Sequence, residues 1–203
     1  MQENGNRYFV VNKPYDMVSQ FVSPHAVRVL GQLSFDFPEG THSVGRLDNE
    51  SEGLLLLTTN KRVTRLLFQS AIPHRRTYLV KVKNIVSGDT LEQIRKGIPI
   101  RVRGGAYYTT APCEADLLPE PVDLFGHPSE KKDYVPYSWL RIALTEGKFH
   151  QVRKMVSAVG HRCIRLIRVS IEDLRLGGLE PGGVRELEEG EFFRLLKIDR
   201  DID

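Results

Sequence analysis

The stretch GRLDNESEGLLLLTTN, residues 45–60, sets an aspartate a few positions before four consecutive leucines. A run this short cannot cross a membrane, and it predicts a strand that is buried on both faces. An aspartate at the lip of such a strand loses hydration and needs a cationic or hydrogen-bonding partner to stay ionised. Asp48 is therefore a candidate functional residue. The competing interpretation is a turn in which the Asp48 side chain only accepts hydrogen bonds from nearby backbone groups.

Length and composition predict one catalytic unit. A chain of 203 residues buries one substantial core or two small lobes that share a sheet. The first ten residues, MQENGNRYFV, lack the basic segment, apolar stretch and cleavage site of a secretory signal, so we expect a cytoplasmic protein without a membrane segment. Cys113 and Cys163 belong to no CxxC motif, which predicts reduced thiols rather than a disulfide framework or a zinc site.

The net charge of +3 is modest, but its distribution is uneven. Six lysines and arginines and no acidic residue lie between Lys148 and Arg168, whereas the segment after Ile171 is rich in acidic residues. This pattern predicts a surface that is basic on one side and able to follow a phosphate backbone. A solvated helix face would produce the same pattern.

The pattern of apolar residues predicts more strands than helices, many of them joined by short turns. We expect strands over residues 7–14, the leucine run, 76–84, 107–118, 138–144, 163–171 and 191–198. We expect helices over residues 25–33, after Asn60, 87–97 and 146–160, and a long surface loop over 119–137. These elements predict an α+β fold with a largely antiparallel sheet flanked by helices.

The segment EGKFHQVRKMVSAVG, residues 146–160, is the second candidate site. As a helix it would carry an apolar stripe made of Phe149, Val152, Val156 and Val159. Arg153 would lie about 40° from Phe149, at the margin of the buried stripe. A partly desolvated guanidinium either reaches out to solvent or pairs with a carboxylate.

Together, GRLD with the following SEG turn and the EGKFHQVRKM segment resemble the two diagnostic motifs of the RNA pseudouridine synthases. The branch is the one that modifies ribosomal RNA and includes the small-subunit enzyme A. The resemblance spans almost the whole chain, from NKPYDMVSQF at residues 12–21 to the last strands. It implies a mixed central sheet with two half-lobes around one cleft, formed by a single catalytic domain over residues 1–203. We expect one departure from the family, the lack of its usual amino-terminal S4 domain, because only a few residues precede the first expected strand. Within the branch, NKPYD and PYSWL resemble the large-subunit enzymes.

The resemblance also implies roles for three residues in catalysis. Asp48 matches the catalytic aspartate, and Arg153 matches the arginine that pairs with it and orients it. Tyr78, in the strand RTYLVKV, matches the tyrosine that lies against the target base and has been assigned proton transfer from C5. A tyrosine on a strand is more often simply a half-buried core residue, so the role of Tyr78 depends on the resemblance.

Substrate contacts follow from the same resemblance. Arg46 matches an arginine that occupies the space left by the extruded nucleotide and holds its phosphate. Leu166 or Ile167 matches the aliphatic floor of the pocket. The remaining RNA contacts are expected from the basic segment, at Lys148, His150, Gln151 and Lys154.

The implied reaction breaks the N1 glycosidic bond of a uridine, rotates the base and joins C5 to C1′. It transfers no external group, so it needs no cofactor and no metal, in keeping with the lack of Walker, GxGxxG and GxSxG motifs. The carboxylate either attacks C1′ or removes a sugar proton to give a glycal. The implied partner is ribosomal RNA, preferably of the large subunit, bound by a monomer away from membranes. The rival hypotheses are a non-catalytic rRNA-binding or ribosome-assembly protein, and a glycoside hydrolase that uses Glu50 or Glu52 beside Asp48.

Overall fold

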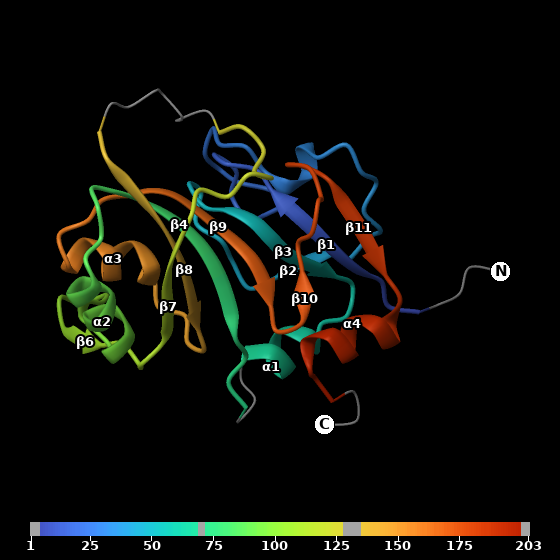
Figure 1. Cartoon of the computed structure of the whole chain (residues 1–203). Helices are drawn as coiled ribbons and strands as arrows, with labels where there is room; N and C mark the ends of the chain where they lie inside the picture. Colours follow the sequence, from blue (N-terminus) through green and yellow to red (C-terminus); the bar gives the residue numbers. More distant parts are fainter. Residues whose placement is uncertain (1–4, 69–71, 128–134, 200–203) are drawn as a thin grey trace. The chain divides into compact units, whose positions relative to one another are not determined.

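The chain divides into two compact units. The computed structural model describes residues 5–68, 72–127 and 135–199 (Figure 1). The first unit comprises Met1–His74 and Arg168–Asp203, and the second comprises Arg75–Ile167. The single catalytic domain expected from the sequence stays a prediction.

The first unit is built around the leucine strand. β3 (Glu52–Thr58) has all seven residues buried, as the leucine run predicted. It pairs antiparallel with β1 (Tyr8–Lys13) and β2 (His42–Val44), and β1 also pairs antiparallel with β11 (Val184–Leu187). β10 (Leu174–Arg175) pairs antiparallel with the end of β9 (Cys163–Ile171). Strands β1 and β3 therefore have partners on both sides and form the interior of this sheet.

Helices complete the first unit. α1 (Val63–Phe68) buries Val63, Leu66 and Leu67, at the spacing predicted for a helix after Asn60. α4 (Glu189–Leu196) falls where we expected a strand, so that expectation is wrong. Its buried residues Phe192, Phe193 and Leu196 share one side of a helix, whereas successive residues of a strand would face opposite sides. The helix expected over residues 25–33 is reduced to one 3₁₀ turn, η1 (Leu30–Gln32).

The second unit packs two helices against a strongly twisted antiparallel sheet. β8 (Tyr137–Leu144) lies between β4 (Arg76–Lys83) and β7 (Glu114–Leu118), with Tyr78 opposite Ile142. α2 (Gly88–Lys96) and α3 (Gln151–Ala158) lie together beside these strands (Figure 1). Their apolar residues form one core with the sheet, made up of Val80, Val82, Leu91, Ile94, Leu140, Ile142, Val152, Met155, Val156 and Leu166 among others. The fold is α+β, as predicted.

α2 is capped at both ends. Ser87 accepts a hydrogen bond from the Thr90 backbone N–H, and Gly97 ends the helix with a φ of 98°. The single strand expected over residues 107–118 is instead two strands, β6 (Tyr107–Thr109) and β7. Pro112 interrupts them because it has no N–H to donate to a neighbouring strand. β6 forms a hairpin with β5 (Pro99–Arg101), which the sequence analysis missed.

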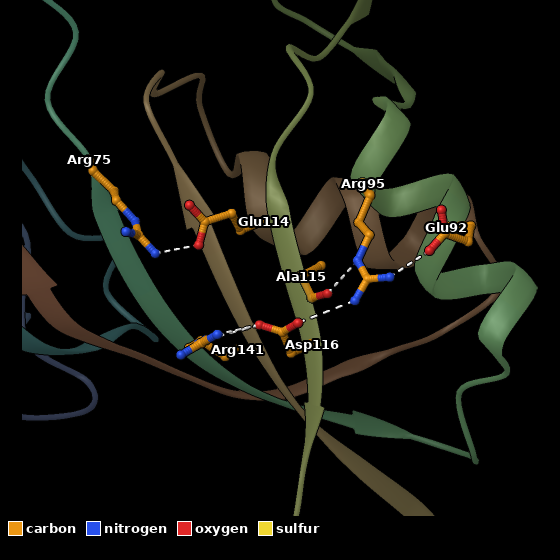
Figure 2. A network of polar contacts seen from close by, with 7 residues as sticks. All are labelled: Arg75, Glu92, Arg95, Glu114, Ala115, Asp116 and Arg141. Carbon is orange, nitrogen blue, oxygen red and sulfur yellow. Dashed lines mark hydrogen bonds and ion pairs between the residues drawn. The ribbon is translucent and has the colours of Figure 1, made fainter.

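A network of charged side chains covers the edge strand β7 (Figure 2). Asp116 forms ion pairs with Arg141 and Arg95, and Arg75 pairs with Glu114. The hydrogen bond from Arg141 is the largest cause that lowers the pKa of Asp116. Arg95 also donates to the backbone oxygen of Ala115, which blunts the open edge of the sheet. These partners are largely exposed, so the network adds little stability.

Two further expectations concern the whole chain. In the described residues, no helix is both long and apolar enough to cross a membrane. Cys113 and Cys163 are not joined in a disulfide in the structure. Burial raises the pKa of the Cys113 thiol to about 11, with smaller contributions from Glu146 and Glu114.

Candidate active site

Asp48 lies in the turn that joins β2 to β3 in the first unit. The Asp48 backbone oxygen accepts a hydrogen bond from the Ser51 N–H at 3.0 Å, which closes the turn. The turn begins at Gly45, whose φ of +73° is costly for other residues. A Cβ at Gly45 would also lie 2.7 Å from Cζ of Phe68. The positive φ favours glycine at this position, and a larger residue would also displace the Phe68 ring.

A buried lysine supports this turn. Lys13, at the end of β1, is fully buried, and its Nζ donates to the backbone oxygens of Pro14, Met17 and Asn49 at 2.9, 2.5 and 3.2 Å. Burial lowers the pKa of Lys13 to about 7, while the carboxylates of Glu52, Asp48 and Asp16 oppose that shift. The lysine thus joins the residue after Asp48 to the first strand of the unit.

The loop that follows β1 holds the turn from a second side. Ser19 Oγ accepts from the Leu47 N–H and donates to the Leu47 oxygen, both at 2.9 Å. Asn49 donates its side-chain N–H to Asp16 at 2.7 Å. The residues on either side of Asp48 are therefore fixed, while Asp48 itself is half-buried and Arg46 is exposed. This arrangement confines the backbone of Asp48 to one conformation.

The second unit contains the other catalytic candidates. Tyr78, on β4, is half-buried and packs against the core of this unit, to which Leu166 also belongs. Arg153 lies on α3 and is half-buried, as expected for a position at the margin of the apolar side of the helix. Asp48 belongs to the first unit and Arg153 to the second, and their pairing stays a prediction.

The helix expected over residues 146–160 is shorter than predicted. α3 starts at Gln151, because His150 adopts a left-handed conformation with φ 55°. Its buried side is formed by Val152, Met155 and Val156, whereas Phe149 is 68% exposed. The placement of Phe149 in a buried stripe is therefore wrong, since the residue precedes the helix and its position on a helical wheel has no meaning.

A carboxylate anchors the turn before α3. Glu146 Oε2 accepts from the Tyr108 hydroxyl at 2.5 Å, and Oε1 accepts from the Ala111 N–H at 2.9 Å and from Gln151 Nε2 at 2.7 Å. The hydrogen bond to Glu146 is the largest cause that raises the pKa of Tyr108. Gln151 is buried and also accepts from the Lys148 N–H. Gln151 thus orders this turn, and both the oxygen and the nitrogen of its side-chain amide bind to other protein groups.

The predicted basic surface is smaller than the sequence suggested. Arg165 and Arg168, on β9, are each 3% exposed. Arg165 donates to the Phe125 oxygen, and Arg168 donates to the Leu54 oxygen. Both arginines therefore support the backbone, and the expectation that all six cations form one surface is wrong. Lys148 and Arg162 are exposed, and Lys154 is half-buried.

The sequence analysis missed Lys13 and Glu146. Lys13 had a detectable signal, because it follows five apolar or amide positions of a strand and precedes a proline. A lysine in a strand whose six residues are all buried has to satisfy its ammonium group through hydrogen bonds. Glu146 had no comparable signal, since its partners on the β5–β6 hairpin come from a strand pair that was not predicted.

Comparison with known proteins supports the motif interpretation. A model of the family described as RNA pseudouridylate synthase matches residues 7–158. The ribosomal large subunit pseudouridine synthase E of Xanthomonas axonopodis pv. citri is 34% identical over 174 residues, covering 85% of this chain and 89% of the relative. The enzyme of the same name from Vibrio parahaemolyticus is 31% identical over 184 residues, covering 90% of this chain and 74% of the relative.

Two further matches extend the comparison. The ribosomal small subunit pseudouridine synthase A of Escherichia coli is 31% identical over 192 residues, covering 94% of this chain and 74% of the relative. A crystal structure of a pseudouridylate synthase has a TM-score of 0.76 at 27% identity, covering 96% of this chain and 76% of that chain. Sequence and fold agree, and the chain belongs to the RNA pseudouridylate synthase family.

Proposed function

We propose that this protein converts one uridine of ribosomal RNA to pseudouridine, with large-subunit rRNA as its preferred substrate and Asp48 as its catalytic carboxylate. The names of the relatives from Xanthomonas and Vibrio support a large-subunit substrate. The observation that carries the role of Asp48 is its position in a turn fixed by Lys13, Ser19 and Asn49. A reacting group has to be held close to its productive geometry, which such a turn provides.

The proposed reaction starts when the target nucleotide leaves its stack and C1′ becomes accessible. The Asp48 carboxylate then attacks C1′ or removes a sugar proton, and in either route the N1 glycosidic bond breaks. The uracil rotates and C5 bonds to C1′, while the bond from C1′ to Asp48 breaks or, in the glycal route, Asp48 returns the proton to the sugar. C5 then loses its proton, and N1 gains one. The net result is an isomerisation in which no electrons are exchanged with a second molecule.

Other residues take supporting roles in this proposal. Arg153 pairs with Asp48 and favours its ionised form. Tyr78 lies against the base, and Leu166 forms the floor of the pocket. Arg46, which is exposed, fills the space left by the nucleotide and contacts its phosphate.

The most direct test of the substrate is a map of pseudouridines in the rRNA of cells with and without this protein. We expect one pseudouridine of large-subunit rRNA to disappear in its absence and to return when the wild-type chain is supplied. An unchanged map together with rRNA binding by the purified protein would favour a non-catalytic ribosome-assembly role instead. Release of free sugar would point to a glycoside hydrolase.

Two further properties are part of the proposal. The protein acts in the cytoplasm, where the proposed substrate is found in bacteria such as those of the named relatives. It acts as a monomer, and sedimentation of the purified protein at several concentrations tests this. A mass equal to twice that of the chain would contradict it.

A further inference from the structure

Phe149 is an exposed aromatic residue in a well-fixed part of the second unit. It is 68% exposed and lies in the turn between β8 and α3, flanked by Lys148 and His150. Burial of a phenylalanine side chain stabilises a protein by about 1.5–3 kcal/mol relative to exposure. Single exposed apolar side chains are common on protein surfaces, so the exposure of Phe149 gains meaning only from the groups around its ring.

Aromatic and cationic groups surround this ring. The His150 ring stacks on the Phe149 ring, with centroids 3.9 Å apart and an angle of 21° between the planes. Lys154 Nζ lies 5.2 Å from the Phe149 centroid, and Lys148 Nζ lies 4.5 Å from the centroid of Tyr108. We call Lys148, Phe149, His150 and Lys154 the aromatic-basic patch. All four residues belong to one unit, so the patch is defined within that unit.

The turn that carries the patch is held by hydrogen bonds on both sides. Gln151 accepts from the Lys148 N–H at 2.8 Å and donates to Glu146 at 2.7 Å. Glu146 in turn accepts from Tyr108 and Ala111 of the neighbouring hairpin segment. The backbone is thus ordered before any ligand binds, which lowers the entropy lost on binding. Exposure of Phe149 results from a defined turn.

The composition of the patch identifies one kind of partner. Proteins that bind single-stranded nucleic acid combine aromatic rings, on which bases stack, with cations that contact the phosphates. Lys154 supplies positive charge at the Phe149 ring, and Lys148, the preceding residue, supplies it over the Tyr108 ring. These charges complement a polyanion and disfavour a neutral apolar partner. An unpaired nucleotide fits both the ring and its charges.

We propose that Phe149 is a stacking platform for an unpaired base of the RNA substrate next to the target uridine, with Lys148 and Lys154 contacting the adjacent phosphates. The inference rests on the proposed function and adds a substrate-binding residue to it. The stacked base is a flanking nucleotide and takes no part in the isomerisation. Base stacking on an aromatic side chain is tolerant of sequence, so the patch adds affinity more than base specificity.

The test compares two fluorescein-labelled RNA probes in anisotropy titrations with the full chain. One is a 12-nucleotide single-stranded oligoadenylate, and the other has the same length and backbone but abasic sites. We expect Phe149→Ala to weaken binding of the oligoadenylate by about 5- to 100-fold and to leave binding of the abasic probe unchanged. Phe149→Trp should bind the oligoadenylate as well as the wild type or better.

Two control variants make the result specific. Ile85→Ala removes another apolar side chain of the second unit that is also 68% exposed, and it should leave both titrations unchanged. Lys154→Gln should weaken the binding of both probes equally and reduce the dependence of binding on salt concentration. Thermal unfolding checks that each variant is folded before it is titrated.

Several outcomes overturn the inference. The first is that the wild-type chain binds both probes with equal affinity. The second is that Phe149→Ala loses affinity equally for both probes, and the third is that it loses none for either. With an isomerisation substrate, Phe149→Ala should raise KM more than it lowers kcat. If the wild-type chain isomerises no rRNA yet distinguishes the two probes, the proposed function fails while the stacking platform stands.

Discussion

The Nζ atom of Lys13 donates a hydrogen bond to the backbone oxygen of Asn49, the residue that follows Asp48, at 3.2 Å. The same ammonium group also donates to Met17 and Pro14, so one buried side chain links the first strand, the loop after it and the turn that carries Asp48. The chemistry proposed for Asp48 therefore depends on a residue that need not touch the substrate.

Replacement of Lys13 with Met should lower the free energy of unfolding by about 2–4 kcal/mol, because three backbone oxygens lose a donor in a buried site. The effect should depend on pH. Since burial lowers the pKa of Lys13 to about 7 from 10.5, the unfolded chain binds a proton that the folded chain has lost between these values. The stability of the wild type should then rise with pH over this range, by up to about 1.4 kcal/mol per pH unit.

Urea unfolding at pH 6 and at pH 9 gives the free energy of unfolding of the wild type and of Lys13→Met, and the effect is the difference between these two values at each pH. The difference should be larger at pH 9. At pH 6 the folded wild type carries the charge of Lys13 in a buried site, and the cost of burying that charge lowers its stability. Lys61→Met, at an exposed lysine, is the matched control and should show neither effect. A difference that stays constant between the two pH values would contradict the lowered pKa.

Gly45→Ala should destabilise the protein more than Gly40→Ala. Both glycines have a positive φ, +73° and +80°, and an alanine there costs about 1–2 kcal/mol in the backbone. A Cβ at Gly40 meets nothing within 4 Å, whereas one at Gly45 would lie 2.7 Å from Phe68 Cζ. Chemical denaturation gives the loss in free energy of unfolding for each variant, and the excess loss in Gly45→Ala measures the steric contact with Phe68. Adding Phe68→Ala to Gly45→Ala should remove that excess. Equal effects of the two substitutions would show that the contact with Phe68 yields freely.

Glu146→Gln should loosen the turn before α3. The carboxylate accepts three hydrogen bonds, and an amide would turn a donor toward at least one of the present donors. We expect a lower thermal midpoint and, by ultraviolet titration, a Tyr108 hydroxyl whose pKa is raised less than in the wild type, because the effect of burial remains. Glu92→Gln changes an exposed carboxylate that pairs with Arg95 and should alter neither quantity. An unchanged Tyr108 titration would contradict the role assigned to Glu146.

The thiol of Cys113 should react slowly with iodoacetamide in the folded protein. A pKa of about 11, against a usual value of 9.0, leaves about 100-fold less thiolate at pH 8. Cys163→Ser makes Cys113 the sole thiol, so its rate is read directly by mass spectrometry. The rate in urea should rise at least by that factor, whereas equal rates in the folded and unfolded chains would contradict the effect of burial.

The elements that could be predicted are those with a strong local pattern. The run of four leucines, ended by Thr58, Thr59 and Asn60, favours a buried strand, and Ser87 and Gly97 cap the two ends of α2. Phe192 and Phe193 were assigned to a strand as part of the apolar segment EFFRLLKI, residues 191–198. In the structure both rings pack on Tyr8, which lies far away in the sequence, and this tertiary contact favours the helix α4 over a strand.

Prediction of the site was limited in the same way. Asp48 and Arg153 stand out through motif resemblance, whereas Lys13 and Glu146 become visible only through partners that folding brings together. Phe149 was placed in a helix because the apolar residues from Phe149 to Val159 have helical spacing, but the left-handed conformation of His150 delays the start of α3 to Gln151, whereas the expected helix began at residue 146. Such a conformation has no reliable signature at a histidine.

The central claim is that the carboxylate of Asp48 performs the isomerisation, and single-turnover formation of pseudouridine by Asp48→Asn tests it most directly. The substrate is the rRNA segment identified by the pseudouridine map, and Glu50→Gln, at an exposed neighbouring carboxylate, is the control. We predict no detectable pseudouridine with Asp48→Asn, RNA binding within a few-fold of wild type, and near-normal turnover with Glu50→Gln. Turnover by Asp48→Asn at the wild-type rate would contradict the account.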